Sequence, residues 1–228
     1  KITNILDGEY ICDRICEMEY DALDKLKESL DGLSNRDINA YEELMYGLLL
    51  SGLAMQMTGH SRPASGAEHH MAHFWEMVIN DEIDAYHGEK VGVGLIQVSD
   101  IYHEAVKYLK EGNFKVKDHV DIETDLIEKT FTNKELCESI KKTNDPNLLD
   151  LIDPKVLREK TEEIIRIIEE IPKADEIVAM LEKVHGVKSL EDIGFTPDMK
   201  EKTARVAPYI RDRITFMRIL KFYDFYDD

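Results

Sequence analysis

The chain has 228 residues, 43% of them hydrophobic, and a formal net charge of −18 at pH 7. This length allows a substantial core, in one large domain or two small ones. The acidic charge argues against nucleic acid and anionic membranes as partners, because both need a basic surface. The apolar runs are shorter than the roughly 18 residues of a membrane-spanning helix, so we predict no membrane insertion. We interpret the three cysteines, Cys12, Cys16 and Cys137, as reduced thiols of a cytoplasmic protein.

The first third of the chain predicts two long helices. Apolar residues recur at helical spacing from Gly8 to about Leu30, and Asp31-Gly32 ends this helix. A second helix is expected over about residues 36–57. Its second half, residues 44–57, is apolar almost all round, which predicts a central, buried helix. A loop broken by Gly59 and Pro63 follows.

The rest of the chain also favours helices. Ser65 and Glu68 fit a capping box, so the next helix should start at Gly66, and another should run from His87 to about Glu111. The later residues predict acidic amphipathic helices at about 121–130, 133–142, 153–170, 173–185, 197–205 and 208–226. We therefore predict one all-α domain over residues 1–228, in two layers of helices. Residues 1–111 should carry the site, and residues 112–228 should form an amphipathic helical layer.

Histidines gather in one region of the sequence. Five of the eight lie at positions 60, 69, 70, 73 and 87. On a helix His69 and His73 face the same side, and a short connection over residues 80–86 can bring His87 back toward His69. Imidazoles suit zinc, iron, nickel or cobalt, and two of them leave a catalytic set one ligand short, most simply by a carboxylate. The spacing alone fits equally well with hydrogen-bonded histidines at a surface.

A second signal is the loop that precedes these histidines. Arg62 lies between Ser61 and Ser65, just before a helix start. Free backbone N–H groups at such a start favour a phosphate, which an arginine can bind through two nitrogens. The alternative is an ordinary capped helix start with a solvated arginine.

Four stretches together resemble a known family. They are SGLAM at 51–55, GHSRPASGAEHH at 59–70, HFW at 73–75 and HGEKVGVG at 87–94, with RDRITFMRIL at 211–220 as a further likeness. The chain resembles the sn-glycerol-1-phosphate dehydrogenases, within the superfamily of iron-containing alcohol dehydrogenases, glycerol dehydrogenases and 3-dehydroquinate synthases. That fold joins an N-terminal α/β domain, which binds NAD(P), to a C-terminal all-helical domain, with the active site between them. The resemblance implies the C-terminal domain alone, with the nucleotide-binding domain absent.

The resemblance also implies roles for individual residues. His69 and His87 match two histidine ligands of a divalent metal, for which we expect Zn²⁺ first, with Ni²⁺ or Fe²⁺ as alternatives. His73 matches a histidine that serves proton transfer, and Ser61, Arg62 and Ser65 would lie near the substrate phosphate. The family's third ligand is an aspartate in a Gly-Asp-Leu stretch, which would precede Lys1. We do not transfer its role to Asp7 or Asp84.

The implied activity is NAD(P)-dependent reduction of dihydroxyacetone phosphate to glycerol 1-phosphate. The metal would polarise the substrate carbonyl, and a relay through His73 or a water molecule would supply the proton. We expect the intact protein to form a homodimer. The isolated chain should bind metal weakly and should not turn over, because the cofactor domain and the third ligand are missing.

Other functions remain as alternatives. A metal-binding bundle of the carboxylate–histidine type needs Glu-x-x-His on two helices, whereas position 67, where such a glutamate would precede His70, is Ala67. A non-catalytic helical interaction domain would bind no metal through His69 and His87. A dehydrogenase for glycerol or another polyol keeps the superfamily, but a neutral polyol does not need Arg62.

Overall fold

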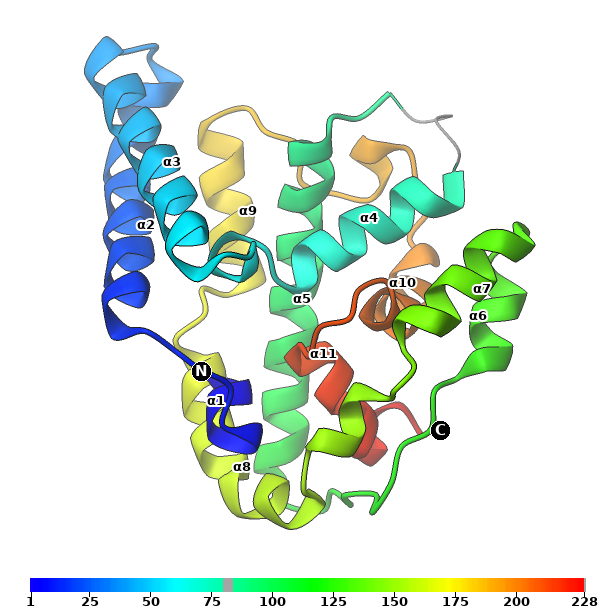
Figure 1. Ribbon diagram of the computed structural model, residues 1–228. Coiled ribbons are helices and arrows are strands. Elements are labelled where there is room, and N and C mark those ends of the chain that lie inside the picture. Colours follow the sequence, from blue (N-terminus) through cyan, green and yellow to red (C-terminus); the bar gives the residue numbers. More distant parts are fainter. Residues whose placement is uncertain (80–83, 228) are drawn as a thin grey trace.

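The computed structural model describes residues 1–79 and 84–227. In these residues every element is a helix, apart from one isolated antiparallel bridge between Val116 and Tyr223 (Figure 1). This confirms the predicted all-α fold class. None of the described helices has both the length and the apolar character to cross a membrane. The predicted connection over residues 80–86 lies partly outside the described residues.

The α-helices follow one another along the chain with short connections. They are α1 (Ile2–Asp7), α2 (Asp13–Ser34), α3 (Ile38–Thr58), α4 (Ala67–Ile79), α5 (His87–Lys110), α6 (Thr124–Thr130), α7 (Lys134–Thr143), α8 (Pro154–Glu169), α9 (Ala174–Lys183), α10 (Met199–Val206) and α11 (Phe216–Ile219). The helix predicted from Gly8 starts later than expected, at Asp13, because Gly8 takes a left-handed conformation (φ 77°) that ends α1.

The apolar helix α3 is not central, and this prediction was wrong. It pairs with α2 along one side of the molecule (Figure 1). Its buried residues are Ala40 and Ala54, whereas Leu48 is 59% exposed and Leu49 is 66% exposed. The physical reason is that α3 packs mainly against α2, with further contacts to the 3₁₀ turn at Arg62–Ala64, so much of its apolar surface turned away from α2 stays exposed.

The main core lies around α4 and α5 instead. Phe74, Trp75 and Val93 from these two helices are at most 1% exposed. They pack with apolar residues of α6 to α8 and of the C-terminal segment. The indole N–H of Trp75 donates to the hydroxyl of Thr203 over 2.8 Å, so the one polar atom of this large side chain is satisfied inside the core.

The C-terminal segment departs from the predicted helix over residues 208–226. The chain forms short 3₁₀ turns around the four-residue helix α11, and residues 214–223 are buried on all sides. Backbone bonds to a neighbouring extended segment redirect the chain: the N–H of Lys117 donates to Phe222 (2.7 Å) and the N–H of Asp224 donates to Lys115 (3.2 Å). Tertiary packing thus overrides a helix-like sequence pattern in this segment.

Candidate metal centre

The histidine cluster is built by the facing ends of α4 and α5. His69, His73 and Glu76 occur at spacings of four and three on α4, so they share one face of that helix. His87 is the first residue of α5. The carboxylate of Glu89 accepts the backbone N–H of Tyr86 over 2.8 Å, which stabilises the first turn of α5 and so fixes the position of His87.

The packing of the two helices depends on Gly94. A Cβ added at this position would lie 2.7 Å from the backbone carbonyl oxygen of Glu68, closer than real Cβ atoms come. Only glycine allows α5 to approach α4 this closely. The close approach is made at the residue directly before His69, so it helps to bring His69 and His87 together.

Three imidazole rings come together at this place. The ring centroids are 5.6 Å apart for His69 and His87, 5.2 Å for His73 and His87, and 6.3 Å for His69 and His73. Two imidazoles that share a tetrahedral metal, at metal–nitrogen distances of about 2 Å, have centroids roughly 5 Å apart. The spacing of His87 to His73 and its spacing to His69 therefore both fit a shared metal ion.

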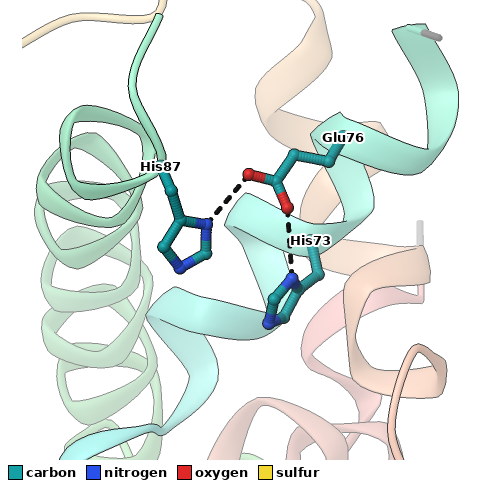
Figure 2. Close-up of side chains that lie close together, drawn as sticks. All are labelled: His73, Glu76 and His87. Atoms are coloured by element: carbon teal, nitrogen blue, oxygen red, sulfur yellow. Dashed lines mark hydrogen bonds and ion pairs between the residues drawn. The ribbon is translucent and has the colours of Figure 1, made fainter. Parts of the chain in front are cut away.

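Two carboxylates, those of Glu76 and Glu68, contact the Nδ1 atoms of the three rings. Glu76 accepts from Nδ1 of His73 (3.2 Å) and from Nδ1 of His87 (2.9 Å), as Figure 2 shows, and its Oε1 also pairs with Lys90 (3.1 Å). Glu68 lies 2.8 Å from Nδ1 of His69. Burial opposes ionisation of Glu76, but its bonds to His87, Lys90 and His73 outweigh this and lower the pKa of Glu76 to about 2. Glu76 is thus a carboxylate at neutral pH.

The donor set fits a divalent metal of the zinc, nickel or iron type. Donor atoms of His73, Glu76 and His87 all lie within 4.8 Å of one another. Nitrogen and carboxylate donors are the ligands that these metals take. This group shares His87 with the ligand pair predicted from the sequence, and adds Glu76 and His73 to the candidates. The ligand roles of His69 and His87 stay predictions.

The protonation of the neighbouring histidines suits such a site. Burial lowers the pKa of His73, and the hydrogen bond that His73 donates to Glu76 opposes this only in part. His70 points away from the cluster into the core, as its helical position predicts. It is 1% exposed, and burial lowers its pKa to about 3. Both residues are therefore neutral imidazoles at neutral pH.

The predicted phosphate loop lies directly before α4, but its arginine is engaged elsewhere. The guanidinium of Arg62 forms an ion pair with Glu9 and a hydrogen bond with Thr3 (3.4 Å). A second arginine holds the loop: Arg213 donates to the carbonyl of Ser65 (2.7 Å) and to the hydroxyl of Ser61 (3.1 Å). The roles of Ser61, Arg62 and Ser65 in substrate binding stay predictions.

Sequence reasoning missed Glu68, Glu76 and Arg213 as parts of this region. The two glutamates carried a usable signal, because each lies within three residues of a histidine on the same helix. Arg213 carried none, since it is 148 positions from Ser65 and only the tertiary fold joins them.

The chain has relatives among known proteins. No family profile matches it. It is 28% identical over 225 residues to a glycerol-1-phosphate dehydrogenase of Halalkalibacterium halodurans, an alignment that covers 96% of this chain and 47% of the relative. The corresponding protein of Geobacillus stearothermophilus is 27% identical over 231 residues, with 96% and 50% covered. That of Bacillus licheniformis is 38% identical over 108 residues, 46% of this chain.

The fold and the histidine cluster define an all-helical unit with a candidate metal site. The chain is a homologue of the glycerol-1-phosphate dehydrogenases over almost its whole length, which confirms the resemblance seen in the sequence. It spans about half the length of the curated relatives that it matches.

Proposed function

We propose that the chain is the metal-binding helical domain of an NAD(P)-dependent sn-glycerol-1-phosphate dehydrogenase, which reduces dihydroxyacetone phosphate. The proposal is carried by one observation: in this homologue of those enzymes, the ring centroids of His69 on α4 and His87 on α5 lie 5.6 Å apart. The predicted dimer, the cytoplasmic location and the division at residue 111 stay predictions.

The residues of the cluster have distinct tasks in this proposal. His69 and His87 hold the metal, whose chemistry when bound is to polarise the substrate carbonyl. His73 lies beside them and is neutral at pH 7, so its imidazole can move a proton. The cofactor carries the hydride, and this domain supplies ligands and orients the substrate.

An anionic substrate is favoured by the arginines that gather at the Ser61–Ser65 loop in an otherwise acidic chain. Arg213 bonds to both ends of the Ser61–Ser65 loop, and the charges of Arg62 and Arg211 act on Arg213. Besides burial, the charge of Arg211 lowers the pKa of His73, so Arg211 lies close enough to the histidine cluster to act on it. A phosphate group can form charge-assisted hydrogen bonds with arginine side chains, whereas a neutral polyol carries no charge to pair with them.

The proposal is tested by binding to the 228-residue chain. We expect Zn²⁺ to bind, and His69→Ala and His87→Ala to reduce its affinity at least 100-fold in a chelator-competition titration. With Zn²⁺ present, dihydroxyacetone phosphate should shift the amide NMR signals of Ser61, Arg62, Ala64 and Ser65, and glycerol at the same concentration should not.

Two results would contradict the proposal. Zn²⁺ affinity that is the same in the wild type and in both histidine variants would remove the metal site. Equal shifts from glycerol and from the phosphorylated substrate would instead favour a polyol dehydrogenase. His119→Ala is the matched control, because His119 is an exposed histidine on a different segment and should bind Zn²⁺ as the wild type does.

A further inference from the structure

We propose that Glu76 and Glu68 are positioning residues, not metal ligands: each binds Nδ1 of a histidine, so that His87 and His69 present Nε2 to the metal. The inference rests on the proposed metal site and deepens it. The two glutamates then orient the ligands, and the metal is held by His69 and His87 rather than by His73, Glu76 and His87.

The hydrogen bonds between the carboxylates and the rings have a defined direction. An ionised carboxylate can only accept, so each ring nitrogen that faces Glu76 or Glu68 must carry the proton. The nitrogens concerned are Nδ1 of His87 (2.9 Å from Glu76) and Nδ1 of His69 (2.8 Å from Glu68). A neutral imidazole with its proton on Nδ1 has its lone pair on Nε2. Both rings are therefore prepared to bind a metal through the same atom.

Both oxygens of the Glu76 carboxylate are already engaged by neighbouring side chains. Its Oε1 already contacts Nδ1 of His87 and the ammonium group of Lys90, and its Oε2 accepts from His73. Figure 2 shows the other nitrogen of both rings on the side away from Glu76. A metal bound directly to Glu76 would have to break these contacts, whereas a metal bound to Nε2 leaves all of them intact.

Glu68 is itself held in place. Its Oε1 accepts the backbone N–H of Gly66 over 2.6 Å as well as facing His69. Its backbone carbonyl is the atom against which Gly94 packs. The side chain is mostly buried, with 19% of it exposed. Glu68 thus links the first turn of α4, the α4–α5 contact and the orientation of His69.

The experiment begins with the metal-free chain, so that it does not depend on enzymatic activity. Long-range ¹H–¹⁵N NMR spectra report which ring nitrogen carries the proton. We expect His69 and His87 to carry it on Nδ1 in the wild type. Glu68→Gln should change the protonation pattern of His69 alone, and Glu76→Gln that of His87 and His73. A proton on Nε2 of either histidine in the wild type would overturn the inference.

Metal titration of the same variants separates positioning from ligation. With Co²⁺ as the probe, His69→Ala and His87→Ala should abolish the absorption bands of bound cobalt. Glu68→Gln and Glu76→Gln should keep these bands but weaken binding about 10- to 100-fold, as is usual for residues that orient a ligand. His73→Ala should keep the bands. Glu104→Gln, an exposed carboxylate on α5, is the control and should bind as the wild type does.

The opposite pattern identifies Glu76 as a ligand. If His73→Ala abolishes Co²⁺ binding and His69→Ala leaves it intact, the metal lies between His73, Glu76 and His87, and the inference is wrong. If none of the histidine variants changes binding, the proposed function loses its metal site. If the histidine variants weaken Co²⁺ binding while Glu68→Gln and Glu76→Gln bind Co²⁺ as the wild type does, the metal site stands and the proposed role of the glutamates is wrong.

Discussion

At the scale of single residues, the buried ammonium group of Lys221 is balanced by an opposite charge and by a further hydrogen bond. Lys221 is 7% exposed, and its ammonium group pairs with Glu123, donates to the carbonyl of Arg205 (3.0 Å) and lies 4.7 Å from the centre of the Tyr209 ring. Glu123 also accepts the hydroxyl of Tyr209 over 3.0 Å. Removing one partner of such a pair leaves the other charge buried without compensation.

We therefore predict that Glu123→Gln destabilises the chain by about 1–3 kcal/mol at pH 7. Burial raises the pKa of Glu123, but Lys221 and Tyr209 outweigh it, and the pKa lies below the ordinary 4.5. The unfolded chain then takes up the proton first as the pH falls. The stabilising effect of Glu123 is complete above pH 4.5 and disappears as the pH falls through the lowered pKa.

Urea unfolding of wild type and variant between pH 7 and pH 3 measures this difference. The gap between the two should narrow below pH 4.5. A constant gap over the whole range would show that the carboxylate charge is not the cause. Adding Lys221→Met to Glu123→Gln should restore part of the lost stability, because the uncompensated charge is then gone.

The residue scale also shows which site residues a sequence can reveal. Helical periodicity places His69 and His73 on one face, and the expected connection over residues 80–86 predicts that His87 can return toward His69. Glu76 follows the same rule at three positions from His73 and could have been found. The ion pair of Arg62 with Glu9 could not, since it joins residues 53 positions apart. Local periodicity predicts neighbours on one helix, and only packing decides which helices meet.

At the scale of elements, the contact between α4 and α5 controls the candidate site. Their shared surface places Gly94 against the backbone of Glu68, one residue before His69. His87 is the first residue of α5, whereas the buried residues of this helix lie further along it, between Val93 and Leu109. A shift of α5 away from α4 would thus separate the two histidines without touching either of them.

We predict that Gly94→Ala reduces both stability and metal affinity. The added methyl group would lie 2.7 Å from a backbone oxygen, and overpacking of this kind costs typically about 1–3 kcal/mol. Gly88→Ala on the same helix meets nothing within 4 Å and is the matched control. Alanine is the better helix former, so this control should be as stable as the wild type or more so.

Thermal unfolding and Zn²⁺ titration of the two variants provide the test. Gly94→Ala should lower the melting temperature and weaken Zn²⁺ binding together. Loss of stability with unchanged Zn²⁺ affinity would mean that the α4–α5 distance does not set the spacing of His69 and His87.

At the scale of the whole molecule, the sequence predicted the class of fold but not the location of its core. Helical periodicity and capping signals sufficed for the all-α class and for most helices. The hydrophobic content of α3 suggested a central helix, yet the core lies around α4, α5 and the C-terminal segment. The apolar residues of a helix indicate that one of its faces is suited to burial. They do not show which element covers that face.

Because the core lies away from α3, two leucines should differ strongly in how much they contribute to stability. Leu157 on α8 is completely buried, whereas Leu49 on α3 is 66% exposed. Leu157→Ala should destabilise the chain by about 2–5 kcal/mol, because it removes buried methyl groups and leaves a cavity. Leu49→Ala should change stability by no more than about 0.5 kcal/mol, as is usual for surface substitutions. Urea unfolding of the two variants gives both values. A loss for Leu49→Ala as large as that for Leu157→Ala would show that the exposed face of α3 is covered in solution.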